Sequence, residues 1–260
     1  MNMFDKKKLK RALKKTGRRV IKPSGTVGKQ KNRDPEEIER LYRDKDYLDA
    51  YSQHTDLRVE KDPRAAIGGR WEEIGHLQFG FLHRMGLEPH HTLLDIGCGT
   101  LRGGRLFISY LDEGHYTGTD ISPKALEFAA ALVHLHGLVD KKPRLLLNEG
   151  KRLTFDEVSG ERFDFLLAQS VFTHLQAPHL GECFEHIGRV MHSGSVFFFT
   201  FWKGDKPEQK GLKDFYYPFS FFESLAKSNG FHLTDRSREY PHPKGQVMVE
   251  MRVKRAAMPA

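Results

Sequence analysis

The sequence predicts an α/β protein: a doubly wound, mostly parallel seven-stranded sheet with an antiparallel C-terminal hairpin and an N-terminal helical extension. Two observations predict this class. From residue 91 onward, short apolar runs alternate with segments of helical periodicity, which is typical of parallel strands joined by crossover helices. The last two runs follow each other across a short turn, which is typical of an antiparallel hairpin.

Five of the predicted strands are continuous apolar runs, which indicates burial on both faces of a sheet. They span 92–97, 116–120, 143–149, 163–170 and 195–202. Two further runs, 231–240 and 246–253, flank the turn "PHPKG" at 241–245 and form the predicted hairpin. Helical periodicity places helices between the strands, over 100–111, 123–136, 178–191 and about 218–229.

The chain divides into three predicted regions, which are a basic flexible arm over 1–33, a helical extension over 34–90 and the α/β domain over 91–255. The extension begins at Asp34, which precedes Pro35 and two glutamates. A capping residue, a proline in the first turn and acids at the positive end of the helix dipole mark a helix start. A second helix is expected over about 71–85, after the glycine-containing loop 65–71.

The net charge of +8 belongs to the arm. Residues 1–33 contain thirteen Lys and Arg and one acid, Asp5, whereas the remaining residues contain 29 basic and 33 acidic side chains. Leu9 and Leu13 share a helical face among lysines, so the arm can form a basic amphipathic helix or remain a solvated tail. Its charge favours an anionic membrane surface as partner. RNA is the less favoured alternative, because the arm lacks interleaved aromatic residues.

The predicted compartment is the cytoplasm, with peripheral membrane contact through the arm. Two cysteines, Cys98 and Cys183, are too few for a disulfide framework or a zinc cluster. The first residues lack the apolar core of a signal peptide, and the apolar run 196–202 is too short to span a bilayer.

A glycine-rich turn follows the first strand of the domain, in "LLDIGCGTLRGGRL" at 93–106. Such turns bind ligands at the carboxyl edge of a parallel sheet, and Gly97 and Gly99 allow the backbone to approach a ligand closely. A dinucleotide and S-adenosylmethionine are the two alternatives. The dinucleotide fingerprint needs a third glycine, but Arg102 stands there. Asp95 also disfavours a diphosphate and suits the ammonium group of a methionine moiety.

The run "LLDIGCGT" resembles the first motif, D-x-G-x-G, of the class I, Rossmann-like S-adenosylmethionine-dependent methyltransferases. The resemblance covers about residues 67–253 and implies S-adenosyl-L-methionine as cofactor. Leu101 departs from the family pattern, which commonly has a third glycine there. Gly103 and Gly104 follow and can permit the same close packing of helix on strand.

The resemblance implies which residues bind this cofactor. Asp120, with Ile121 beside it, lies 23 residues beyond Gly97 and would accept the ribose hydroxyls, as an acid also does in NAD sites. In "NEGKRLTF" at 148–155, Glu149 would lie near the adenine amino group and Gly150 beside the ring. The cofactor set is completed by Gln169 and Ser170, which would line the cofactor site, and by Gly69 and Arg70, or Arg102, near the methionine carboxylate.

The methyl acceptor is the least determined part of the prediction. His174, just beyond the fourth strand, is the first candidate general base and His242 the second, since histidine titrates near neutral pH. The histidines show no metal-ligand spacing. Loop 203–219 reads as a substrate lid.

The expected reaction is O-methylation of a small-molecule, sugar or glycolipid hydroxyl. The motifs of amino-methylating nucleic-acid enzymes and of cytosine-C5 enzymes are both absent. Three alternatives stay open: an RNA methyltransferase that uses the arm, an NAD-dependent oxidoreductase, and a cofactor-binding scaffold without catalysis.

Overall fold

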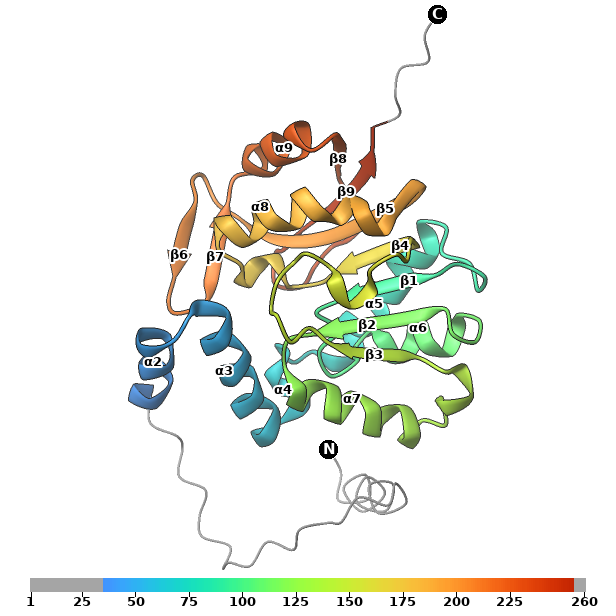
Figure 1. Cartoon of the computed structure of the whole chain (residues 1–260), viewed down its shortest axis with the longest axis horizontal. Helices are drawn as coiled ribbons and strands as arrows, with labels where there is room; N and C mark the ends of the chain where they lie inside the picture. Colours follow the sequence, from blue (N-terminus) through green and yellow to red (C-terminus); the bar gives the residue numbers. More distant parts are fainter. Residues whose placement is uncertain (1–34, 255–260) are drawn as a thin grey trace, which may run out of the picture.

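The computed structural model describes residues 35–254 of the 260-residue chain (Figure 1). The basic arm expected over 1–33 lies outside the described residues.

Five parallel strands form the centre of the sheet, in the order β3-β2-β1-β4-β5. Their bounds are β1 (Leu93–Ile96), β2 (Tyr116–Asp120), β3 (Arg144–Leu147), β4 (Phe163–Ala168) and β5 (Met191–Lys203). The register pairs Leu93 with Tyr116 and Leu93 with Phe165, so β1 lies between β2 and β4. This arrangement confirms the predicted parallel sheet, and it brings the carboxyl ends of β1, β2 and β4 to one edge.

Two antiparallel strands continue the sheet beyond β5, as predicted. Strand β9 (Val247–Val253) pairs with β5, and β8 (Phe231–Asp235) pairs with β9. The connection between them differs from the short turn expected at 241–245, because β8 ends at Asp235 and residues 236–246 leave the sheet. Tyr240 in this segment is buried, with its ring 5.1 Å from the ring of Phe81. Packing of Tyr240 therefore draws the segment away from strand pairing and toward the carboxyl edge.

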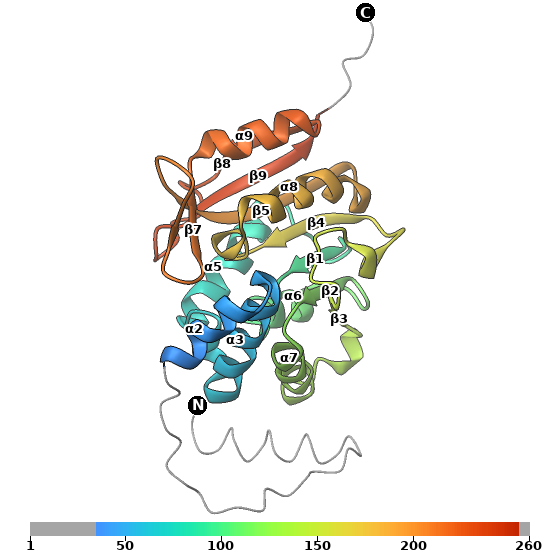
Figure 2. The same cartoon turned by 60° about the vertical axis from the view of Figure 1, so that its left-hand side comes forward.

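The predicted lid at 203–219 contains a second hairpin, β6 (Glu208–Lys210) and β7 (Asp214–Tyr217). Strand β7 runs parallel to the end of β5, pairing Trp202 with Tyr216, and brings the described sheet to nine strands. In Figure 2 this hairpin has come forward, and it is seen above α2 (Pro35–Asp44) and α3 (Tyr47–Lys61).

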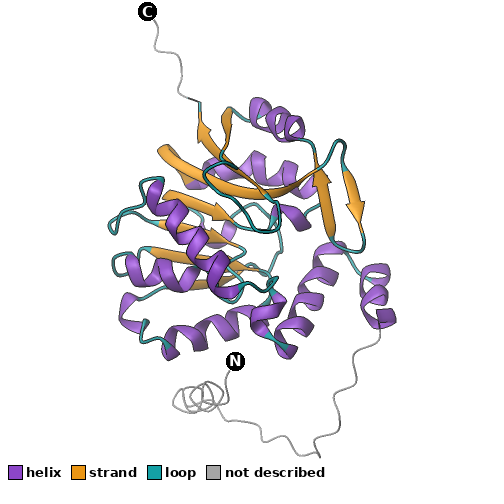
Figure 3. Cartoon of the chain, turned by 180° about the vertical axis from the view of Figure 1, so that it is seen from behind, coloured by secondary structure: helices purple, strands orange, loops and turns teal. Residues whose placement is uncertain are grey.

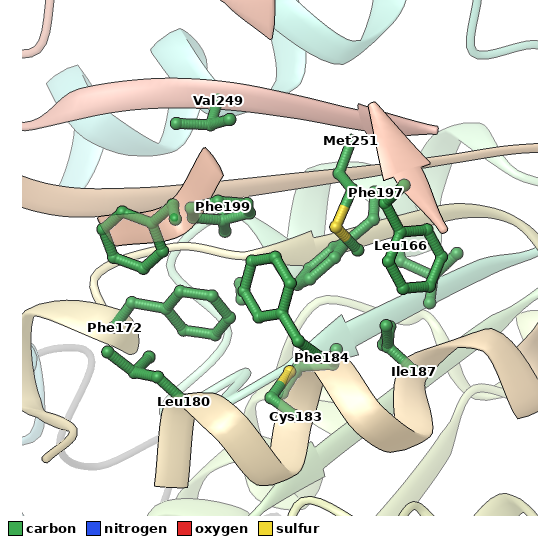
Figure 4. Packing of buried hydrophobic residues seen from close by; sticks show 14 of the residues in the cluster. Leu166, Phe172, Leu180, Cys183, Phe184, Ile187, Phe197, Phe199, Val249 and Met251 are labelled. Atoms are coloured by element: carbon green, nitrogen blue, oxygen red, sulfur yellow. The ribbon is translucent and has the colours of Figure 1, made fainter. Parts of the chain in front are cut away.

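Helices cover both faces of the sheet (Figure 3). On one face lie α5 (Trp71–Arg84), α6 (Gly104–Tyr110) and α7 (Pro123–Leu135); on the other lie α8 (Ala177–His186) and α9 (Phe219–Ser228). Strand β5 shows how the sequence produces two faces: Phe197 and Phe199 pack toward α8, whereas Phe198 packs toward Phe81 of α5. In Figure 4, Phe184 of α8 and Ile187, just after its end, point toward the buried strand residues.

The N-terminal helices pack against the α/β part of the chain. Trp71, Phe81 and Leu82 of α5 belong to the same buried cluster as residues of β1 and β4. Helix α3 is tied to the loop after β2, where Ser52 Oγ donates to the carbonyl of Ile121 at 2.8 Å. Between α3 and α5, Asp62 caps the short α4 (Pro63–Ala66). Of the helices in the described ranges, none has the length and apolar character needed to cross a bilayer.

Candidate cofactor and acceptor site

A cavity of about 370 Å³ lies at the carboxyl ends of β1, β2 and β4. Its wall is formed on one side by the glycine turn and the residues that follow β2 and β4. On the other side it is formed by α3, the loop before α5, the start of β7 and the segment 236–246. Ligands bind at this edge of open parallel sheets, so the position agrees with the predicted site.

The glycine turn lies so close to neighbouring residues that side chains larger than glycine would not fit there. Gly97 has φ +68°, and a Cβ atom there would lie 2.5 Å from Val171 Cγ2. Leu101, at the position where the family commonly has glycine, is buried with φ +63°. A Cβ at Gly103 would overlap Gln78 Oε1, and one at Gly104 would overlap Tyr116 Oη. Gly104 therefore allows α6 to pack closely on β2, as predicted, whereas Gly103 allows close packing on α5.

Asp95 and Arg102 place opposite charges in the same cavity wall. The Asp95 carboxylate is buried and accepts a hydrogen bond from Tyr116 Oη at 2.7 Å. Burial raises the pKa of Asp95 to about 7, against the lowering effects of the Tyr116 hydrogen bond and the Arg102 charge. Arg102 is also buried; its Nη1 donates to the carbonyls of Ile67 and Gly69, and its Nε has no partner within 35–254. A buried acid beside a buried guanidinium suits a zwitterionic amino-acid group.

Asp120 stands at the end of β2 with both carboxylate oxygens engaged by backbone amides. Oδ2 accepts from Gly99 N and Oδ1 from Ser122 N, both at 2.8 Å. Burial raises the pKa of Asp120 to about 6, and the two amides oppose that shift. Each oxygen retains a second lone pair, so the group can still accept hydroxyl hydrogen bonds from a ligand. Ile121 lines the cavity next to it.

Gln169 and Ser170 lie at the end of β4 in a polar network that segment 236–246 completes. Tyr240 Oη donates to Gln169 Oε1 at 2.7 Å, and Gln169 Nε2 donates to Gln246 Oε1 at 3.0 Å. Ser170 Oγ donates to the same Gln246 oxygen. Both predicted residues therefore line the cavity, but their orientation depends on Tyr240 and Gln246, which no sequence motif marked.

His174 lines the cavity with a fixed tautomer. Its Nδ1 lies 2.9 Å from the Lys213 carbonyl and 3.2 Å from Asp214 Oδ1. Since a carbonyl only accepts, Nδ1 carries the proton and Nε2 of the neutral ring is free to accept one. Burial lowers the pKa of His174, and the Asp214 hydrogen bond opposes that shift. This is the arrangement of a general base oriented by a carboxylate.

His242, the second candidate base, also lines the cavity but has different partners. Its Nδ1 faces the backbone amides of Lys244 at 3.3 Å and Gln246 at 3.4 Å, and its Nε2 lies 3.5 Å from Gln169 Nε2, so donors face both ring nitrogens. Burial, together with the charges of Arg102 and Lys244, lowers the pKa of His242 to about 4. The ring is a neutral, weakly basic part of the wall, and its geometry does not favour proton abstraction.

Four predicted cofactor residues do not line the cavity: Gly69, Arg70, Glu149 and Gly150. Arg70 Nη1 instead pairs with Glu73 Oε2 at 2.9 Å at the start of α5. Strand β3 ends at Leu147, so Asn148 is the residue at the cavity edge, and the chain then turns outward and leaves Glu149 exposed. Asn148 and Lys151 line this edge of the cavity, whereas Glu149 does not.

The structure adds wall residues that sequence reasoning missed. Tyr51 and Arg58 come from α3, Lys213 from the turn before β7, and Lys244 from segment 236–246. No short sequence motif contains these residues, because they come from three segments that are far apart in the chain. Within 35–254, no group of three or more His, Cys, Asp or Glu is arranged to hold a metal ion.

Residues 94–197 match the family model of a methyltransferase domain. This segment contains the glycine turn, β2, β3 and β4, and the match agrees with the predicted resemblance to the class I, Rossmann-like S-adenosylmethionine-dependent methyltransferases. The predicted family is thereby confirmed, and S-adenosylmethionine, the cofactor of this class, is favoured over the dinucleotide alternative.

Among solved structures, the fold of this chain resembles that of magnesium protoporphyrin IX methyltransferase from Synechocystis with S-adenosylmethionine bound. The TM-score is 0.61 at 14% identity, covering 81% of this chain and 98% of that one. A sterol 24-C-methyltransferase from Gibberella zeae is 28% identical over 115 residues, which is 44% of this chain and 28% of that one. A geranyl diphosphate 2-C-methyltransferase from Saccharopolyspora erythraea is 36% identical over 70 residues, 26% and 24% of the two chains. The chain thus spans about a quarter of the length of these curated relatives.

Proposed function

We propose that this methyltransferase transfers the methyl group of S-adenosylmethionine to a hydroxyl oxygen of a small, sugar or lipid-linked acceptor. One observation carries the proposal: the cavity that contains Asp95, Arg102 and Asp120 also contains His174, whose Nε2 is free to accept a proton. Residues suited to binding the cofactor and a candidate base therefore line the same cavity.

The cofactor side of the cavity fits the functional groups of S-adenosylmethionine. Asp95 would hold the ammonium group and Arg102 the carboxylate, since the two are buried side chains of opposite charge. Asp120 would accept the ribose hydroxyls with the lone pairs left free by its backbone amides. Asn148 would lie at the adenine edge in place of Glu149.

When bound, S-adenosylmethionine supplies a methyl group that is bonded to a positively charged sulfur. A nucleophile takes this methyl group in line, and the sulfur is the leaving group. His174 would accept the hydroxyl proton at Nε2, and Asp214 would stabilise the resulting imidazolium through Nδ1. Holding the reacting groups together in a closed cavity can supply about 7–11 kcal/mol of the barrier reduction.

The arm at 1–33 supports peripheral membrane contact as part of this proposal, through its excess of Lys and Arg. RNA methylation is the competing use of the same charge. Incubation with methyl-labelled S-adenosylmethionine and cell extract, split into lipid, RNA and soluble pools, separates the two. Label in the lipid or soluble pool that survives deletion of 1–33 supports a small acceptor, and label confined to RNA contradicts it.

Calorimetric titration with S-adenosylhomocysteine tests the cofactor assignment. We expect one site per chain, and NADH should give no heat. Binding of NADH in preference to S-adenosylhomocysteine would overturn the proposed function.

A further inference from the structure

We propose that the methyl acceptor carries an oxyanion, a phosphate or a carboxylate, which binds to Arg58, Lys213 and Lys244 on the acceptor side of the cavity. This inference rests on the proposed function, because it assumes that the cofactor occupies the other side. It narrows the acceptor from any hydroxyl compound to an anionic one.

Within the described part of the chain, the three cations line one cavity without a close ion pair, and the carboxylate near enough to attract all three is Asp214. Arg58 Nη2 donates to the carbonyl of Ala65 at 3.0 Å, and Lys244 Nζ donates to the carbonyl of Gly68 at 2.6 Å. Lys213 Nζ lies 5.7 Å from the centre of the Tyr51 ring. Among residues 35–254, no carboxylate lies within ion-pair distance of any of the three. Other bases on the chain do pair; Lys151, also in the cavity wall, lies 2.9 Å from Asp49.

The cations are close enough to affect one another. Burial lowers the pKa of Lys213 to about 8, and the charge of Arg58 contributes to the lowering. The pKa of Lys244 is lowered by burial and by the charges of Arg102, Arg70 and Arg58. Like charges gathered around one cavity oppose each other until an anion enters it.

The cofactor does not account for this positive charge. Five basic and three acidic side chains line the cavity. The amino-acid end of S-adenosylmethionine requires one cation and one anion, which Arg102 and Asp95 provide. On the acceptor side the acid is Asp214, and it is engaged by His174. Arg58, Lys213 and Lys244 remain beyond this pair; Lys244 lies nearest to Arg102, at the Gly68 backbone, and Asp214 offsets one of the three charges.

The placement of the cations also determines where the anionic group would lie. Lys213 is adjacent in sequence to Asp214, and its carbonyl oxygen accepts from His174 Nδ1. Tyr51 lies with its ring 5.2 Å from the His174 ring and close to Lys213. An oxyanion at Lys213 therefore lies near His174, so the hydroxyl to be methylated is close to the acidic group in the acceptor.

The test uses full-length protein saturated with S-adenosylhomocysteine, so that the cofactor side is filled. Inorganic phosphate, sn-glycerol 3-phosphate, acetate and vesicles of phosphatidic acid are then titrated separately. We expect at least one probe to bind at a single site, and Arg58→Met and Lys213→Met each to weaken that binding at least about tenfold. Lys227→Met, an exposed lysine on α9, is the matched control and should bind as wild type does.

The four probes and the three variants together separate the possible outcomes. Binding of glycerol phosphate or acetate indicates a soluble anionic acceptor. Binding of the vesicles indicates a lipid headgroup only if Arg58→Met and Lys213→Met weaken it; vesicle binding alone that these variants leave unchanged is binding by the basic arm and refutes the inference. If the cofactor product binds but no probe does, or if Lys227→Met weakens binding equally, the anionic acceptor is refuted while the proposed function stands. If wild-type protein fails to bind S-adenosylhomocysteine, the proposed function itself fails.

A second readout does not depend on the folding of any variant. Methyl-labelled product from cell extract is passed over an anion exchanger. We expect the label to be retained on the column and released by salt. Label found entirely in the unretained neutral fraction would overturn the inference.

Discussion

Cofactor affinity should depend on pH through Asp95. The free protein holds this carboxyl buried with a pKa of about 7, whereas the ammonium group of the ligand requires it ionised. Protonation of Asp95 therefore competes with ligand binding, and affinity should fall as pH falls through 7. Each pH unit below the pKa lowers the ionised fraction about tenfold, so affinity at pH 5.5 should be roughly thirtyfold lower than at pH 8.

Asp95→Asn should remove most of this dependence and weaken binding at pH 8 by at least about tenfold. It should also stabilise the ligand-free protein at pH 8. The folded state binds the Asp95 proton more tightly than the unfolded state, so wild-type stability falls as pH rises from about 4 to 7, and the amide removes that loss. The amide oxygen can still accept from Tyr116.

The assay is calorimetric titration with S-adenosylhomocysteine between pH 5.5 and 8, with thermal denaturation alongside. Asp205→Asn, an exposed acid outside the cavity wall, is the control and should follow wild type in both measurements. A shallower dependence below about pH 6 is expected to persist in Asp95→Asn, because burial raises the pKa of Asp120 to about 6. Wild-type affinity that stays constant over this range, or an Asp95→Asn variant with unchanged pH dependence, would refute the reasoning.

Three further predictions concern other parts of the wall. Asp120→Ala should weaken S-adenosylhomocysteine binding at least about tenfold in calorimetry, through loss of a charged hydrogen bond; unchanged affinity would contradict the ribose role. His174→Gln should lower kcat by about 10²–10⁴ in a labelled-methyl assay while leaving cofactor affinity within about twofold, whereas His242→Gln should lower kcat much less. Equal losses in both variants would refute the choice of base. Gly97→Ala should abolish detectable cofactor binding, because its Cβ would lie 2.5 Å from Val171 Cγ2 and φ is +68°; binding within about twofold of wild type would show that the turn relaxes freely.

The sequence predicts the central sheet because its strands are buried on both faces. In β5, Phe197 and Phe199 face one cluster and Phe198 the other, so a continuous apolar run is required and is visible in the sequence. The hairpin in the segment 203–219 contains no such long apolar run, so the sequence does not predict its two strands. Glu208–Lys210 is exposed throughout, and a short polar strand at the edge of a sheet carries no apolar pattern.

Some site residues belong to one short motif and can be recognised from the sequence, whereas others depend on contacts between distant segments. Gly97, Gly99 and Asp95 belong to one short motif, so they could be assigned from the sequence and they do line the cavity. The partners of the two histidines could not be assigned, because they are the Lys213 carbonyl for His174 and the backbone amides of 244 and 246 for His242.

The charged residues of the cavity wall suit a different ligand on each side of the cavity, and His174 links the binding of the acceptor to its reaction. Asp95 and Asp120 lie on the cofactor side, whereas the unpaired cations lie on the acceptor side. In the free protein, burial and the charge of Lys213 both lower the pKa of His174, which makes it a weaker base. An oxyanion bound at Lys213 would offset the charge of that lysine and raise the pKa of the imidazole beside it. On the proposed anionic acceptor, the base would therefore become stronger when the acceptor is present, and the same cations that select the acceptor would couple its binding to proton removal.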